Sequence, residues 1–124
     1  MSIYIKPTGP RDARIAIVGE APGRDEEQNG KPFCGAAGYE LTTELRDAGI
    51  AFHDCFVTNV IRFRPEDNDI EHFITPVKKR GEAHGFVPLD GMWVAPFVKE
   101  HLQTLMFELE EVKPNVVVAL GNTS

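Results

Sequence analysis

The stretch Ala13-Arg14-Ile15-Ala16-Ile17-Val18, continued by Gly19-Glu20-Ala21-Pro22-Gly23, decides the fold of this chain. Its first six residues are mostly apolar and partly β-branched, which indicates a strand buried on both faces. The region 19–38 that follows contains seven Gly or Pro in twenty residues. A loop of this length inside a compact domain is typical of a functional segment rather than a passive connector.

Regular elements follow this loop in alternation. Apolar spacing predicts helices over 36–48 and 95–112, with a short helix around 70–74, and apolar runs predict strands over 54–61 and 116–120. This order predicts an α/β fold, with a central parallel sheet between helix layers in a three-layer α/β/α arrangement. Ligands of such sheets bind at the carboxyl ends of the strands. The loop after Val18, the residues around Asn59 and the segment 121–124 are therefore expected to meet at one edge.

Length and composition exclude several classes of protein. The 124 residues fit a single domain, 1–124, and the 42% hydrophobic and 26% charged content excludes disorder as the default. No apolar run approaches the roughly 18 residues of a membrane span, and 1–10 lacks the apolar stretch of a signal peptide. We expect an intracellular protein, in the cytoplasm or at the nucleoid, with no membrane partner. The net charge of −6 argues against broad affinity for nucleic acid.

Three blocks of sequence resemble a known family. The segment 19–23 followed by Gly30-Lys31-Pro32-Phe33-Cys34-Gly35-Ala36-Ala37-Gly38 is similar to the first motif of the family-4 uracil-DNA glycosylases. Val57-Thr58-Asn59-Val60 followed by Arg64-Pro65 resembles the second motif, and the segment 113–121 resembles the strand after the long helix. Residues 67–93 fit poorly and are expected to be an insertion. The resemblance implies a uracil-DNA glycosylase-like fold.

The resemblance also implies a substrate and a site. The family hydrolyses the N-glycosidic bond of flipped-out uracil in DNA, in base excision repair. Phe33 matches the aromatic residue that stacks on the base, and Asn59 the amide that reads uracil. Glu20 and Ala21 match the catalytic loop, in which the backbone also binds the base at Gly19, Pro22 and Gly23. Without the motif, Glu20 would be read as a solvated acid, Phe33 as a loop anchor and Asn59 as a backbone cap.

Basic residues after the Asn59 strand are candidates for contacts to DNA phosphates. They are Arg62, Arg64, Lys78, Lys79 and Arg80. The triplet 78–80 follows that strand on the expected ligand side. A solvated basic turn is the alternative interpretation of the triplet.

The sequence departs from the family where an iron–sulfur cluster would bind. No cysteine precedes Cys34, and Phe63 stands where a cluster ligand is expected. Cys34 and Cys55 match no ligand position and are expected to be two buried free thiols. We therefore expect no cluster, no other metal and no cofactor. The missing cysteines and the 67–93 insertion suggest a divergent branch, for which a virus-encoded protein is one hypothesis.

A second departure concerns the later part of the family's fold. None of the four histidines precedes the Pro-Ser of the family's His-Pro-Ser motif, and His101 is expected on the surface of the long helix. The last residues, 121–124, resemble a helix start with no helix after them. We expect a truncated domain without its C-terminal strand and helix, whose third strand is an apolar edge open to a complementary segment or to self-association. The alternative functions are a non-catalytic module that binds a base or nucleic acid and an incomplete fragment.

Overall fold

A parallel sheet of three strands forms the centre of the protein. The computed structural model describes residues 3–120 and orders the strands β2 (Phe56–Asn59), β1 (Ile15–Gly19) and β6 (Val116–Ala119). In this register Gly19 lies beside Asn59 at the carboxyl ends of β1 and β2. The predicted strand buried on both faces is confirmed, because Ala16 and Ile17 are both fully buried.

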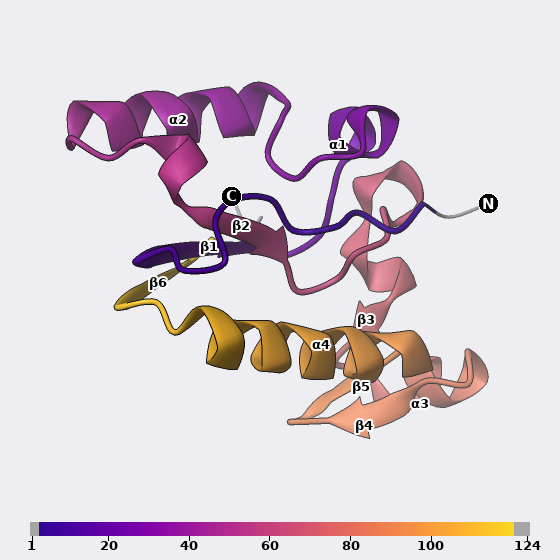
Figure 1. Ribbon diagram of the computed structural model, residues 1–124. Coiled ribbons are helices and arrows are strands. Elements are labelled where there is room, and N and C mark those ends of the chain that lie inside the picture. Colours follow the sequence, from indigo (N-terminus) through magenta and orange to yellow (C-terminus); the bar gives the residue numbers. More distant parts are fainter. Residues whose placement is uncertain (1–2, 121–124) are drawn as a thin grey trace.

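Helices cover both faces of this sheet (Figure 1). Helix α2 (Ala36–Asp47) lies over one face and helix α4 (Pro96–Val112) over the other. Alternate residues of the strands supply the two cores, as the period of two in a strand requires. Ile17 and Val57 pack with residues of α2, whereas Ala16 and Phe56 pack with residues of α4. The predicted α/β fold is confirmed.

The glycine-rich loop contains a helix that the sequence did not indicate. Helix α1 (Arg24–Asn29) begins after Gly23, with Asp25, Glu26 and Glu27 in its first turn, and ends at Gly30 in the left-handed conformation with φ of 71°. Acidic residues stabilise the start of a helix, and glycine adopts the left-handed cap conformation without strain. These two end signals can be read in the sequence. The longer helices, however, were predicted from apolar periodicity, and six residues are too few to show one.

Residues 67–93, which the sequence predicts to be an insertion, form most of a small unit beside the start of α4. Strands β3 (Ile74–Thr75), β5 (Met92–Val94) and β4 (Val87–Leu89) form an antiparallel sheet with helix α3 (Lys78–Ala83). Three single 3-10 turns come before β3 in the chain: Phe52–Asp54, Glu66–Asn68 and Ile70–His72. The helix expected around 70–74 is therefore one such turn. The basic triplet 78–80 begins a helix and does not form the turn that was the alternative interpretation.

The two edges of the parallel sheet differ. The N-terminal segment covers the outer edge of β2, since Thr8 and Val57 form an antiparallel bridge with N···O distances of 2.8 and 2.9 Å. Within residues 3–120 no strand pairs with the outer edge of β6, where Val116 is 53% and Val117 47% exposed. The prediction of an apolar third-strand edge is confirmed for these residues. No helix among them is long and apolar enough to cross a membrane.

Candidate active site

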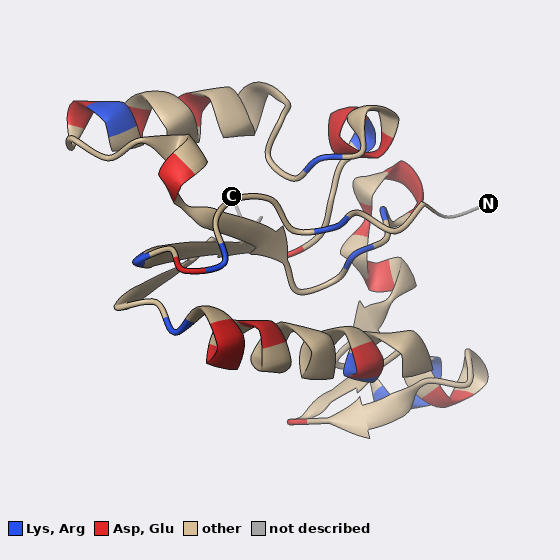
Figure 2. Ribbon diagram, viewed as in Figure 1, with Lys and Arg blue, Asp and Glu red and all other residues tan. Residues whose placement is uncertain are grey.

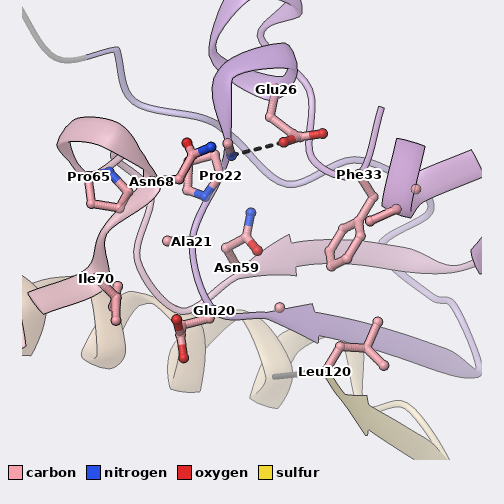
Figure 3. A pocket seen from close by; sticks show the side chains of 14 residues that line it. Glu20, Ala21, Pro22, Glu26, Phe33, Asn59, Pro65, Asn68, Ile70 and Leu120 are labelled. Atoms are coloured by element: carbon pink, nitrogen blue, oxygen red, sulfur yellow. Dashed lines mark hydrogen bonds between the residues drawn. The ribbon is translucent and has the colours of Figure 1, made fainter. Parts of the chain in front are cut away.

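A cavity of about 360 Å³ opens at the carboxyl ends of β1 and β2 (Figure 3). All seven residues that the sequence assigned to catalysis or base binding line it: Gly19, Glu20, Ala21, Pro22, Gly23, Phe33 and Asn59. The remaining walls come from Glu26, Ala37, Gly38, Pro65, Asn68, Ile70 and Leu120. The prediction that segment 121–124 also reaches this edge falls on residues outside the described part of the chain.

Asn59 and Phe33 flank the backbone of Gly19. A Cβ atom at Gly19 would lie 2.5 Å from Asn59 Oδ1 and 2.5 Å from the Cζ atom of Phe33, so a larger residue would have to displace these side chains. Asn59 is 4% exposed, and its side-chain amide makes no hydrogen bond to another residue of the range 3–120. The amide is therefore held at the cavity with its hydrogen-bonding groups unused.

Phe33 both anchors its loop and forms a wall of the cavity. Its ring packs against the buried cluster of Ile17, Cys55 and Val57. Its backbone is in the left-handed region, with φ of 54°, which is strained for a bulky residue. Gly38 permits this shape, because a Cβ there would overlap the Phe33 carbonyl. Gly38 thus makes room for the backbone of Phe33, and the buried cluster supports its ring.

The loop residues Glu20 and Ala21, for which the sequence predicts a catalytic role, are held in place by backbone hydrogen bonds and packing. The N–H of Val60 donates to the Gly19 carbonyl at 2.9 Å, and the N–H of Ile61 donates to the Glu20 carbonyl at 3.0 Å. Ala21 packs on the apolar cluster around Ile61. The Glu20 carboxylate points away from Asn59 and Phe33, as Figure 3 shows.

Glu26 is a site residue that the sequence reasoning missed. One of its carboxylate oxygens accepts a hydrogen bond from the Gly23 N–H at 2.9 Å. The other accepts from the N–H groups of Cys34 at 3.1 Å and Gly35 at 2.8 Å. The carboxylate therefore joins the loop after β1 to the loop that carries Phe33. The spacing of Gly23 and Glu26, three residues apart before a helix, is a capping signal that could have indicated it.

The predicted phosphate contacts divide into three groups. Arg62 is fully buried and ion-paired with Glu108, so its guanidinium cannot reach a phosphate and that prediction is wrong. Arg64 lies near the cavity, where it contacts Asn68 at 2.8 Å and Glu27 at 3.7 Å. The triplet Lys78, Lys79 and Arg80 is exposed but does not line the cavity.

Charge around the cavity is mixed (Figure 2). Acidic residues lie on α1 and on the segment after β2, on either side of the opening. Arg80 is paired with Glu71 at 3.4 Å, and Lys78 with Glu82 at 3.8 Å. These exposed pairs neutralise part of the basic triplet. Arg64 is held beside the cavity by its hydrogen bond to Asn68, a residue of the cavity wall.

His101 and the cysteines differ from the sequence predictions. His101 is buried, and its Nδ1 accepts a hydrogen bond from the Arg62 N–H at 3.1 Å, so the prediction of a surface histidine is wrong. Cys55 is buried, as expected, but Cys34 is exposed. Burial raises the pKa of the Cys55 thiol, and partial burial of the Cys34 thiol beside the Glu26 carboxylate raises that pKa too.

An iron–sulfur cluster of the family does not fit the residues present. Such clusters are held by cysteine thiolates, generally four of them. The chain has two cysteines, one exposed and one buried, and their raised pKa values disfavour the thiolate. Across residues 3–120, no three His, Cys, Asp or Glu side chains are grouped in a way that could hold a metal ion. No step of the chemistry below is therefore routed through a cluster.

Comparison with known proteins shows the family of this chain. The family model described as the uracil DNA glycosylase superfamily matches residues 6–124. This chain belongs to the uracil DNA glycosylase superfamily. Among curated relatives, the type-4 uracil-DNA glycosylase of Archaeoglobus fulgidus is 36% identical over 118 residues, 95% of this chain and 48% of the relative. That of Thermotoga maritima is 35% identical over 116 residues, 94% of this chain and 49% of the relative.

A third relative is also matched over most of this chain but over less than half of its own length. The type-4 uracil-DNA glycosylase of Pyrobaculum aerophilum is 36% identical over 107 residues, which are 86% of this chain and 43% of the relative. The chain thus spans about half the length of the curated relatives it matches.

Proposed function

We propose that this chain recognises uracil in DNA and hydrolyses its N-glycosidic bond, in base excision repair. The observation that supports this best is the pairing of Phe33 with the unengaged amide of Asn59 across Gly19. A flipped base would stack on the ring while its edge meets the amide. The substrate is genomic DNA, so we expect the chain to act in the cytoplasm or at the nucleoid.

The Asn59 amide can distinguish uracil from cytosine. Its carbonyl accepts a hydrogen bond from uracil N3–H, and its NH₂ group donates to O4. Cytosine presents an acceptor and a donor at these two positions, so both contacts would be mismatched. A site built for hydrogen bonds rejects such a base strongly, because its polar groups would be left unpaired.

We assign the catalytic role to Glu20. As the N1–C1′ bond breaks, its electrons move to uracil N1 and positive charge develops on the sugar. The Glu20 carboxylate stabilises that charge and takes a proton from the water whose oxygen bonds to C1′. Ala21 contributes backbone and space only. Arg64 would hold a phosphate beside the opening.

A cleavage assay tests the proposal. A single-stranded oligonucleotide with one uracil is incubated with the chain and then with alkali, which breaks the strand at an abasic site. We expect uracil-dependent cleavage that is abolished by Asn59→Ala and by Glu20→Gln. The exposed Asn115 provides the matched control, since Asn115→Ala should leave cleavage unchanged. Absence of cleavage from a chain shown to be folded by circular dichroism would refute catalysis by this chain.

A non-catalytic uracil-binding module is the second candidate function. The orientation of the Glu20 carboxylate away from Asn59 and Phe33 favours it. This candidate predicts tighter binding to uracil-containing than to cytosine-containing DNA, lost in Asn59→Ala, without any strand breakage. The exposed edge of β6 is where a complementary segment or a second copy would add a strand. Sedimentation of the chain at increasing concentration would detect self-association.

A further inference from the structure

Beneath Asn59 lies a buried ion pair that the proposed chemistry does not use. The guanidinium of Arg62 is fully buried, and the Glu108 side chain on α4 is 12% exposed. The two make a two-pronged contact, with N···O distances of 2.6 Å from Nη2 to Oε1 and 3.3 Å from Nη1 to Oε2. Such a pair brings little net stability, because removing both charges from water offsets most of their attraction. The pair is therefore better explained by its effect on the position of a neighbouring residue.

The residue that the pair positions is Asn59. The Nε–H of Arg62 donates to the main-chain carbonyl of Asn59 at 2.7 Å. Asn59 is the last residue of β2, and the backbone hydrogen bonds to the neighbouring segment continue past it through the N–H groups of Val60 and Ile61. The guanidinium thus holds the main chain of the residue whose side chain lines the cavity, in addition to the pairing of Asn59 with Gly19.

Arg62 itself is held by two separate parts of the chain. Besides Glu108, its guanidinium donates to Tyr4 Oη at 3.3 Å. Its main-chain N–H donates to His101 Nδ1 at 3.1 Å, and its carbonyl accepts from the Ile5 N–H at 2.8 Å. The N-terminal segment and α4 therefore both fix the position of a single side chain, which then fixes Asn59.

We propose that Arg62 and Glu108 form a positioning pair that orients the Asn59 amide for base reading. Arg62 acts from below the site and touches no substrate. This role rests on the proposed function of Asn59 in uracil recognition. The planar fork of arginine suits it, since one edge can bind the carboxylate while Nε donates to the carbonyl.

The test replaces the pair without leaving a buried charge. The double variant Arg62→Met/Glu108→Leu keeps side-chain volume and apolar packing, a change that proteins often tolerate. Glu111→Gln, on the exposed face of α4, is the matched control. The first readout needs no ligand: the NMR signals of the Asn59 side-chain NH₂ group, identified by their loss in Asn59→Ala. We expect them to shift in the double variant and to stay unchanged in Glu111→Gln.

The second readout is the preference for DNA containing uracil over the same DNA containing cytosine. Loss of one fixed hydrogen bond corresponds to about a tenfold change, so we expect the preference to fall about tenfold in the folded double variant. A purely structural role would lower the melting temperature and leave the preference unchanged. Arg62→Lys keeps the charge but not the fork, and we expect it not to restore the preference.

The outcomes separate this inference from the proposed function. If the wild-type chain shows no preference for uracil, the proposed function fails, and the NMR comparison still decides whether the pair orients Asn59. If Asn59→Ala removes the preference but the folded double variant retains both the preference and the wild-type Asn59 signals, the positioning role is overturned.

Discussion

Two carboxylates hold the two halves of the cavity, and they do so in different surroundings. Glu108 is buried and acts through Arg62 on the floor of the cavity, at Asn59. Glu26 lies at the rim and accepts three backbone N–H groups around Phe33. The floor depends on a charge pair that is largely buried, with Glu108 12% exposed, whereas the rim depends on hydrogen bonds that water can partly replace. Changes to the floor should therefore affect stability most.

Removing Glu108 should give the largest effect. Glu108→Ala leaves the Arg62 guanidinium buried without its anionic partner, which costs about 3–5 kcal/mol of unfolding free energy. Chemical denaturation followed by circular dichroism measures it. Glu111→Ala on the same helix is the control, and we expect a change within about 0.5 kcal/mol there. If the two variants lost the same unfolding free energy, Glu108 would contribute no more to stability than an exposed acidic side chain does.

A methyl group at Gly19 tests the contact between floor and rim. Gly19→Ala places Cβ against both Asn59 Oδ1 and the Phe33 ring, and overpacking of this kind costs about 1–3 kcal/mol. Because both neighbours are side chains that can move, we expect uracil recognition to suffer more than stability. Binding of uracil-containing DNA and thermal unfolding should be measured together. Undiminished binding would mean that Phe33 and Asn59 do not act as a pair. Gly49→Ala, which meets no atom within 4 Å, controls for the effect of an added methyl group away from the site, although its positive φ adds some strain.

Changing the rim should have a smaller effect. Glu26→Gln replaces one accepting oxygen by an NH₂ group and loses at least one hydrogen bond to a backbone N–H, which costs about 1–2 kcal/mol. Thermal unfolding measures the loss, and the fluorescence of a base analogue bound at Phe33 reports the ring position. The neighbouring Glu27→Gln breaks only the ion pair with Arg64, at 3.7 Å, and should cost less than about 1 kcal/mol.

Acidification should have the smallest effect. It should lower the stability of the fold through His101, which accepts a hydrogen bond from the Arg62 N–H. Burial and the positive charge of Arg62 lower the pKa of His101, while Glu100 opposes them. The unfolded chain therefore binds a proton near pH 6.5 that the folded chain still refuses, and stability falls as pH decreases below about 6.5. Unfolding free energies at pH 7.5 and 5.5 should differ more in the wild type than in His101→Gln. The exposed His53 supplies the control, since His53→Gln should keep the wild-type pH dependence.

The strands, the long helices and the cavity could be predicted because each has a short-range signal. The apolar run before Gly19 and the position of Asn59 at a strand end suffice to bring both to one edge of a parallel sheet. Arg62 could not be placed, because a basic residue after a strand carries no signal of its partner 46 positions away at Glu108. His101 was misplaced for the same reason: its hydrogen bond to Arg62 spans 39 positions.

The left-handed backbone of Phe33 places two conflicting requirements on this position. A bulky residue in this conformation carries roughly 1–2 kcal/mol of strain that glycine would not carry. The backbone at this position thus favours glycine, whereas the proposed stacking on a base needs an aromatic ring. Selection for a more stable loop alone would remove the ring, so its retention in this chain marks a compromise between fold stability and ligand contact.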